Sequence, residues 1–183
     1  MVTCIHKWLV MRVVRLSYNK MGHKIMHNIK PIGIIHSPHY NIEDMPIQPK
    51  GASGVEGYVL VNEKYIDGLQ DLEGFSHIYL LYNFHKATRT ELLVKPFMDK
   101  QTRGVFATRS PLRPNHIGIS IVKLSRVEGN KVIVEGIDIL DGTPLLDIKP
   151  YIEKFDAVKQ SVSGWLQASD KEIRKKRSDN RFR

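Results

Sequence analysis

The sequence predicts a mainly β protein, a closed or nearly closed β-barrel with one or two short helices. Short apolar segments rich in Val, Ile and Tyr recur along the chain, and glycine-containing turns separate them. Only one segment has the apolar spacing of a helix, and no repeated strand–helix unit is visible. Many short strands with tight turns are typical of barrels, in which a sheet closes on itself.

The first predicted elements cover the N-terminal part of the barrel. The stretch IKPIGIIHSP (29–38) begins the fold, and residues 39–53 are rich in turn formers and predict a loop. A β-rich run bounded by glycines predicts a strand within 54–61. Asn62 is a favourable N-cap for a helix over 62–74, where apolar residues recur at helical spacing.

The remaining predicted elements are strands. The aromatic and aliphatic run FSHIYLLYNFH predicts a fully buried strand over 75–85. The segments IGISIVKLSRV (117–127) and KVIVEGIDIL (131–140) flank the turn EGN and predict a hairpin. Three shorter strands are predicted over 91–97, 103–109 and 143–151.

The net charge of +9 is concentrated at the two ends of the chain. Residues 1–30 contain six Lys and Arg and no acid, and residues 171–183 contain seven against two acids. The 140 residues between them hold 15 basic and 17 acidic side chains. A basic end attracts a phosphate backbone, but it is also the composition of a solvated, disordered end. Charge alone therefore leaves nucleic-acid binding open.

These contrasts divide the 183 residues into three parts. Residues 1–28 have no acid and no clean period, so we expect an N-terminal appendage, disordered or translated from a start codon that is not the native one. Residues 29–160 hold every predicted barrel element and form one domain. Residues 161–183 are predicted to form a basic C-terminal tail.

Several classes of protein are disfavoured by the sequence. The single cysteine, Cys4, excludes an internal disulfide and fits a reducing compartment, so we expect a cytoplasmic protein. No apolar run approaches the roughly 20 residues of a membrane span. The nucleophile-elbow, P-loop and dinucleotide motifs are missing, and the histidines lack the spacing of metal ligands, so we expect no metal.

The connection GVFATRSPLRPNHIGIS (104–120) is unusual because it carries two arginines and two prolines between strands. The prolines stiffen the backbone and remove donors, so the segment cannot join a neighbouring sheet. A stiff loop that holds Arg109 and Arg113 outward is suited to an anionic partner. A solvated turn with exposed arginines is an equally good interpretation of this segment alone.

Polar residues also gather where predicted strands end. His85 and Lys86 close the long aromatic strand, and Asp138 and Asp141 lie near the end of EGIDILDGTP. Strand ends at a barrel rim commonly carry chemistry, because the sheet holds the loops rigid. Asp138 interrupts an apolar strand, so it needs a partner if it points inward, whereas Asp141-Gly142 reads as a plain turn.

The segment 104–120 closely resembles the signature of the TsaA-like (TrmO) family, GxFATRSxxRPNPIGxS. The resemblance covers roughly residues 29–155, in the family's order. It departs at His116, where the family usually has a proline, and in length, since the chain resembles the short archaeal members without an additional C-terminal domain. The further matching segments are GIIHSP (33–38), IQPKG (47–51), LEGFSHIYLLYNFH (72–85) and DILDGTPLLDIKPY (138–151).

This resemblance implies a β-barrel methyltransferase that uses S-adenosylmethionine and acts on tRNA. Family members methylate threonylcarbamoyladenosine beside the anticodon, at the nitrogen that carries the carbamoyl group. The resemblance also implies a homodimer with the cofactor near the subunit interface. The implied cofactor-binding residues are Gln48, Pro49, Lys50, His85, Lys86, Arg109, Ile119, Gly136, Ile137 and Asp138.

Roles for some of these residues follow from the chemistry of the reaction. We expect Arg109 to face the cofactor's carboxylate or an RNA phosphate, because the cofactor's sulfonium is itself positive. Asp138 is the predicted catalytic residue, as proton acceptor or as partner of the ribose diol, and Asp141 is the alternative acceptor. The residues predicted to contact the anticodon stem-loop are Arg109, Arg113, Asn115 and His116.

Two other functions remain open at this point. One is a non-catalytic RNA-binding barrel, and the other is a methyltransferase that acts on a different substrate.

Overall fold

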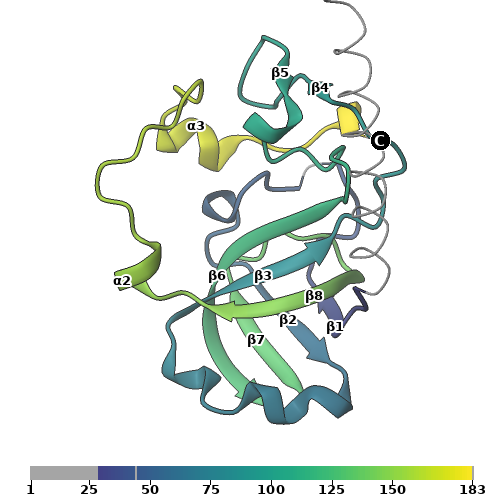
Figure 1. The fold of residues 1–183 in the computed structure, drawn as a ribbon, viewed down its shortest axis with the longest axis vertical. Coiled ribbons are helices and arrows are strands. Elements are labelled where there is room, and N and C mark those ends of the chain that lie inside the picture. The colour runs from purple at the N-terminus through teal and green to yellow at the C-terminus, as the bar shows by residue number, and fades with distance from the viewer. Residues whose placement is uncertain (1–28, 44, 183) are drawn as a thin grey trace, which may run out of the picture. The chain divides into compact units, whose positions relative to one another are not determined.

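The computed structural model describes residues 29–43 and 45–182, and the predicted appendage over 1–28 lies outside them. Six antiparallel strands form a closed barrel in the order β1–β2–β7–β6–β3–β8, and β8 pairs with β1 (Figure 1). The predicted fold class is confirmed. The barrel strands are β1 Gly33–His36, β2 Glu56–Val61, β3 His77–Asn83, β6 Ile117–Glu128, β7 Lys131–Glu135 and β8 Thr143–Pro150.

Alternating side chains fill the inside of the barrel. Along β2 and β3 every second residue is buried, as expected of strands with one covered face. The prediction that β3 is buried on both faces is wrong, because Tyr79 and Leu81 on its outer face keep part of their surface exposed. The fully buried core includes Ile35, Val59, Ile78, Leu80, Val122, Val132 and Leu145.

The β6–β7 hairpin forms around the predicted EGN turn, with Gly129 at φ +60°. β7 ends at Glu135, however, so the predicted strand over 131–140 is too long. Gly136 takes φ +83°, a conformation that glycine adopts without strain, and turns the chain away from the sheet. Residues 136–142 consequently form a connection at one rim of the barrel, and Asp138 lies in it.

The predicted helix over 62–74 is wrong in type. The chain forms two 3₁₀ helices instead, η2 Glu63–Leu69 and η3 Leu72–Gly74. Asp71 stands between them at φ +63°, which interrupts helical geometry. The Asn62 side chain makes no capping bond and donates to the carbonyl of Pro31 at 3.3 Å.

The predicted strands over 91–97 and 103–109 shrink to β4 Leu93–Val94 and β5 Arg103–Gly104, which pair only with each other. After β5 the chain turns into the 3₁₀ helix η4 Val105–Ala107, which begins the arginine-rich loop. Pro96, two residues after β4, restricts the length of that strand, since proline cannot donate to a ladder. A second, small core lies beneath these segments and consists of Val94, Phe97, Val105, Leu112 and Phe182.

The segment after β8 contains α2 Glu153–Asp156, α3 Asp170–Lys175 and the 3₁₀ helix η5 Asn180–Phe182. Ser169 and Glu172 form a capping box that starts α3, with Ser169 Oγ accepting from the Glu172 N–H. Arg177 forms a bridge with Pro46, and the Ser178 N–H donates to the Met45 carbonyl at 2.9 Å. The predicted boundary between residues 160 and 161 stays a prediction, but the residues beyond it contact the barrel domain at these points.

The described ranges lack two features. No helix within 29–43 or 45–182 is long and apolar enough to cross a membrane. Within the same ranges, no three His, Cys, Asp or Glu side chains are grouped to hold a metal ion.

Candidate active site at the barrel rim

Three predicted site residues from distant parts of the chain meet at one rim of the barrel. Gln48 immediately precedes the 3₁₀ helix η1 Pro49–Gly51, Arg109 follows η4, and Asp138 follows β7. The Arg109 Nη1 group donates to Gln48 Oε1 at 3.0 Å. The positive charge of Arg109 also favours the ionised form of Asp138. The structure therefore places a guanidinium and a carboxylate within electrostatic reach of each other.

Asp138 is held by the interior of the barrel. Burial raises the pKa of its carboxyl from 3.8 to about 6, and the hydrogen bond from Ser120 and the charge of Arg109 lower it only in part. Ser120 Oγ donates to Asp138 Oδ1 at 2.7 Å, so the single hydroxyl proton of Ser120 is used there. The Tyr82 hydroxyl, 3.2 Å from Ser120 Oγ, must then be the donor to Ser120.

Gly118 makes the space that this arrangement needs. A Cβ atom at this position would lie 2.3 Å from Cε2 of Tyr82 and 2.5 Å from its Cζ. Gly118 and Ser120 both face the barrel interior from β6, two residues apart, and they support the same phenol ring. The Gly-x-Ser of the motif thus builds a pocket for Tyr82 and a donor for Asp138.

The arginine-rich loop is braced from within by Arg113. Its Nε donates to the Ser110 carbonyl at 2.9 Å, and its Nη2 donates to the carbonyls of Thr108 at 2.5 Å and Val105 at 3.3 Å. The expectation that both guanidinium groups point outward is therefore wrong for Arg113. It satisfies carbonyls that a tight, proline-containing loop cannot pair with a sheet. Arg109 is the exposed arginine of the two.

His116 closes the same loop. It lies at φ +49°, and its Nδ1 is 2.8 Å from the Pro111 carbonyl. A proline cannot reach this backbone conformation, because its ring holds φ near −65°. The loop end therefore depends on a non-proline residue in this chain. Asn115, next to it, is exposed.

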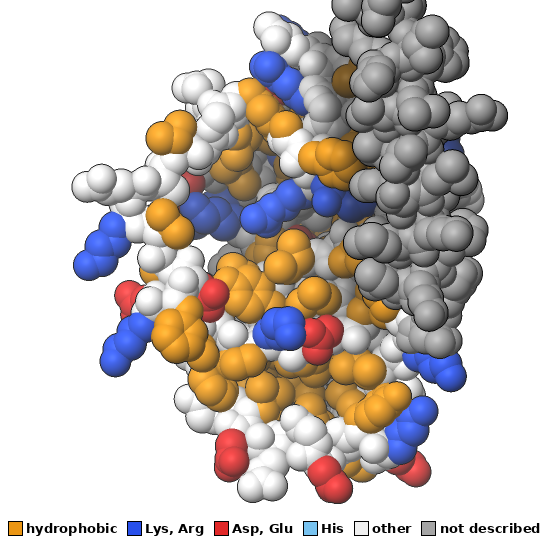
Figure 2. All heavy atoms as spheres, in the orientation of Figure 1, with side chains coloured by type: hydrophobic (Ala, Val, Ile, Leu, Met, Phe, Trp, Pro, Cys, Tyr) orange, Lys and Arg blue, Asp and Glu red, His pale blue; other side chains and the backbone are white. Residues whose placement is uncertain are grey.

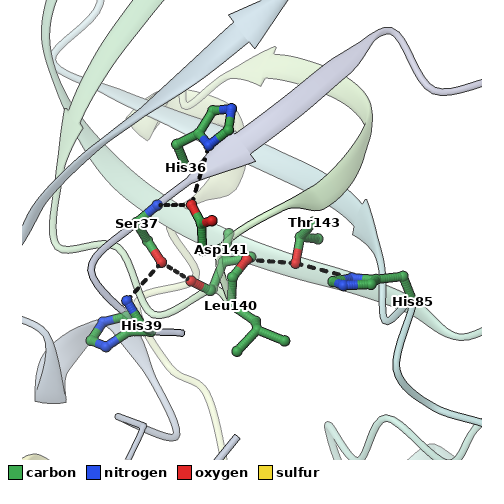
Figure 3. A network of polar contacts seen from close by, with 8 residues as sticks. His36, Ser37, His39, His85, Leu140, Asp141 and Thr143 are labelled. Atoms are coloured by element: carbon green, nitrogen blue, oxygen red, sulfur yellow. Dashed lines mark hydrogen bonds and ion pairs between the residues drawn. The ribbon is translucent and has the colours of Figure 1, made fainter. Parts of the chain in front are cut away.

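Asp141, the alternative proton acceptor, belongs to a separate polar network that ties β1 to the loop before β8 (Figure 3). Its Oδ1 accepts from the Ser37 N–H at 3.1 Å and lies 3.2 Å from His36 Nδ1. Ser37 Oγ in turn donates to the Ile139 carbonyl at 2.5 Å. His39 Nε2 lies 3.1 Å from the carbonyl of Ile137, so the network also fixes the backbone on both sides of Asp138.

His85 and Lys86 lie on the other side of this loop. Thr143 Oγ1 donates to the Leu140 carbonyl at 2.7 Å and lies 3.3 Å from His85 Nδ1 (Figure 3). Burial and the neighbouring Lys86 lower the pKa of His85, which favours its neutral form. With the Thr143 proton used on Leu140, the His85 Nδ1–H is the donor to Thr143.

An open cleft of about 420 Å³ lies beside Lys86. The volume falls in the range of small-molecule sites. One of the predicted cofactor-binding residues, Lys86, lines it, and Leu140 connects it to the loop that carries Asp138. The residues that line the cleft are Tyr40, Asn41, Ile42, Lys86, Thr88 and Leu140.

The other predicted cofactor residues are placed differently. Pro49 and Lys50 lie in η1, and the Lys50 ammonium pairs with Asp170 of α3 at 3.0 Å. Ile137 is fully buried in the core, so only its backbone can meet a ligand. Gly136 forms the turn described above. Ile119 is 45% exposed on the outer face of β6, opposite the face that carries Ser120.

Sequence reasoning did not identify Tyr82, Ser120 or Gly118 as parts of the site. Gly118 and Ser120 were present in the match to Gly-x-Ser at the end of the signature, and Tyr82 was present in the matching segment 72–85, but no mechanism was attached to them. The partner of Asp138 lies 18 residues away on β6, the first strand of the predicted hairpin, so the hairpin was a usable signal for the Ser120–Asp138 contact.

This geometry can now be compared with known proteins. A family model described as the tRNA-methyltransferase O N-terminal domain matches residues 34–157. The chain belongs to this family. The matched range begins in β1 and ends just after α2, so the TrmO domain covers the whole barrel. The resemblance to the TrmO family is thereby confirmed.

Individual relatives agree with this membership. A probable S-adenosyl-L-methionine-binding protein of Pyrococcus abyssi is 50% identical over 153 residues, covering 84% of this chain and 83% of the relative. A tRNA (adenine(37)-N6)-methyltransferase of Mus musculus is 38% identical over 135 residues, covering 70% of this chain and 31% of the relative.

Among solved structures, the crystal structure of TrmO from Pseudomonas aeruginosa aligns with a TM-score of 0.65 and 38% identity. The alignment covers 77% of this chain and 63% of that one. The chain thus spans a little under two thirds of the solved TrmO structure and about a third of the mouse enzyme.

Proposed function

We propose that the protein is an S-adenosylmethionine-dependent methyltransferase that modifies tRNA. More specifically, we propose that the substrate is threonylcarbamoyladenosine beside the anticodon, methylated at the nitrogen that carries the carbamoyl group. The observation that carries the proposal is Asp138, a carboxyl with a pKa of about 6 next to Arg109 at the rim of a TrmO-family barrel. The names of the Pyrococcus and mouse relatives support the cofactor and the substrate class.

The donor set at the rim fits the proposed cofactor. Arg109 offers an exposed cation for the cofactor's carboxylate. Gln48, Pro49 and Lys50 present backbone groups beside Arg109, on a short helical turn that begins with proline. Lys86 contributes from the wall of the cleft, and the other proposed cofactor-binding residues are His85, Gly136 and Ile137. S-adenosylmethionine supplies an electrophilic methyl group when it is bound.

Asp138 is the proposed proton acceptor for the carbamoyl-bearing nitrogen. With a pKa of about 6 the carboxyl is ionised at neutral pH and still basic enough to take up a proton. The short bond from Ser120 fixes the orientation of this carboxylate. The larger demand of an in-line transfer is to hold the nitrogen and the methyl group at near-attack distance, which is worth about 7–11 kcal/mol. Asp141 is already engaged with Ser37 and His36, which favours Asp138 in this role.

The proposed enzyme is a homodimer. Ile119 faces outward and cannot approach Asp138 from inside its own barrel, so a contact between Ile119 and the cofactor requires a site shared between subunits. Apolar residues surround Ile119 on the outer face. Ile121 pairs with Tyr79 and Ile119 pairs with Leu81 across β6 and β3. Figure 2 shows hydrophobic side chains gathered over this part of the barrel, around one close acidic–basic pair.

Three measurements test these assignments. Mass spectrometry of tRNA from a deletion strain should show loss of the methylated threonylcarbamoyladenosine, and an unchanged level excludes this substrate. Calorimetry with S-adenosylmethionine should give saturable heat, and no heat would favour a non-catalytic RNA-binding barrel. Light scattering should give a dimer mass that Ile121→Arg reduces. We further propose that the enzyme acts in the cytoplasm, where its substrate is found.

A further inference from the structure

Phe106 has an exposed side chain on a backbone that hydrogen bonds hold in place. The side chain lies on η4, three residues before Arg109, with 77% of its surface in water. The Thr108 N–H and hydroxyl both donate to the Val105 carbonyl, at 3.1 and 2.8 Å, and Arg113 donates to the same carbonyl. These bonds hold the backbone that carries the ring, and an exposed aromatic residue on a well-bonded backbone is a common feature of binding surfaces.

The C-terminal segment contacts the chain next to this ring. The indole Nε1 of Trp165 donates to the carbonyl of Ala107, the residue after Phe106, at 2.7 Å. The guanidinium of Arg103 lies over the Trp165 ring, 5.8 Å from its centroid. In the chain Phe106 stands between Arg103, whose guanidinium is paired with Asp99 at 2.7 Å, and Arg109. The Trp165 ring and the Arg103 guanidinium are anchored beside it.

The same segment then carries cations toward the cofactor loop. Asp170, at the start of α3, pairs with Lys50 of η1, and Arg177 donates to the Gly51 carbonyl at 3.5 Å. Lys171 and Lys175 are exposed and four residues apart, so they share one side of the helix, away from the side that carries Asp170. Figure 2 shows Lys and Arg side chains in a band between the barrel and the part of the chain with α3, β4 and β5.

We propose that Phe106 stacks on an unpaired base of the tRNA while Lys171 and Lys175 hold its phosphates. This inference rests on the proposed function and names the RNA-binding surface of that site. The charge of the surroundings selects the occupant, because an apolar ring among arginines and lysines complements a base on a polyanion. A second copy of this chain, equally basic, is the poorer occupant of the same surface.

The test is the affinity for an anticodon stem-loop carrying threonylcarbamoyladenosine, measured by fluorescence anisotropy. Phe106→Ala should raise the Kd roughly 5- to 150-fold, the range of one lost base–aromatic stack. Phe106→Trp should keep the affinity, and Phe106→Leu should not, because it keeps apolar surface without a ring. Phe155→Ala is the matched control: Phe155 is 79% exposed on α2, outside this surface, and its loss should change nothing.

The salt dependence of binding tests Lys171 and Lys175 separately. The double variant Lys171→Ala, Lys175→Ala should weaken binding and make the slope of log Kobs against log salt less negative by about 1 to 2. An unchanged slope removes α3 from the surface and overturns that half of the proposal.

Several outcomes separate failure of this inference from failure of the proposed function. If the unaltered chain binds the stem-loop and Phe106→Ala binds equally well, the stacking role is overturned and the tRNA assignment stands. If Phe106→Ala lowers the mass seen by light scattering, the ring contacts a second copy of the chain instead. If the unaltered chain does not bind the stem-loop while it still binds S-adenosylmethionine, both proposals about RNA are overturned.

Discussion

Ser120 donates a 2.7 Å hydrogen bond to the Asp138 carboxylate, and the buried Tyr82 hydroxyl donates to Ser120. Asp138, the carboxylate that interrupts an apolar segment, is thus the end of a chain of two hydrogen bonds that begins at Tyr82 inside the barrel. Two opposing effects act on Asp138. Burial raises its pKa, while Ser120 and Arg109 lower it, and burial is the larger.

Methyl transfer should therefore depend on pH through Asp138. We expect kcat/KM to rise with pH and to reach half its plateau near pH 6, where the carboxyl ionises. Ser120→Ala removes a bond that lowers this pKa, so the midpoint should move upward and the plateau should fall. Tyr82→Phe, which leaves the Ser120–Asp138 bond in place, should move the midpoint less. A midpoint that is the same in Ser120→Ala and the unaltered enzyme would contradict this role.

The free energy of unfolding should also depend on pH through Asp138, but it should fall as pH rises. The folded pKa of Asp138 is about 6 against an ordinary 3.8, so between these pH values the folded state keeps a proton that the unfolded chain has released. Stability then falls as pH rises from about 4 to 6. Asp138→Asn should be more stable than the unaltered protein at pH 7.5, by up to about 3 kcal/mol, and should lose this advantage at pH 4. Urea unfolding at both pH values measures it, with the exposed Asp67→Asn as the control.

Gly118→Ala should destabilise the barrel because the added methyl group overlaps the Tyr82 ring, at 2.3 Å from Cε2. The ring is buried and hydrogen-bonded to Ser120, so it cannot swing aside freely. We expect a loss of about 1–3 kcal/mol in the free energy of unfolding. Gly104→Ala is the matched control, since nothing lies within 4 Å of its added Cβ and its φ is −60°. Equal stability of the two variants would show that Tyr82 packs elsewhere.

His116→Pro should disturb the arginine-rich loop, although proline is the usual residue of the family at this position. The backbone at φ +49° excludes proline, and the substitution also removes the bonds to the Arg113 and Pro111 carbonyls. We expect a lower melting temperature and weaker binding of S-adenosylmethionine. His116→Asn should be tolerated better, because asparagine adopts this conformation readily. A fully stable proline variant would mean that the loop can follow a second path.

Arg113→Ala should weaken the binding of both S-adenosylmethionine and tRNA. The guanidinium binds the carbonyls of Val105, Thr108 and Ser110, and these residues hold the backbone on both sides of Arg109. Without the brace, the position of Arg109 relaxes for both ligands. Calorimetry and anisotropy measure the two affinities, and the exposed Arg126→Ala on β6 is the control. If the variant lost tRNA binding alone, the result would support a direct contact between Arg113 and RNA.

The family and the barrel could be predicted from the sequence because both depend on local pattern. Alternating apolar residues specify strands with one inner face, as β2 and β3 confirm, and a long ungapped motif identifies the TrmO domain. The helix predicted over 62–74 was wrong in type because its apolar spacing is also compatible with two 3₁₀ helices, and Asp71 in the left-handed region separates them.

Only the tertiary structure decided which polar groups pair. Arg113 turns inward to carbonyls of its own loop, and Asp138 accepts a hydrogen bond from Ser120 on β6. The C-terminal segment binds η1 through Lys50 and Asp170. Composition identifies a charged or polar group, but its partner is chosen by which strands and loops the closed barrel brings together. Where burial displaces water, as it does at Arg113 and Asp138, a polar group must find such a partner, and so the chemistry of the rim is determined by the fold.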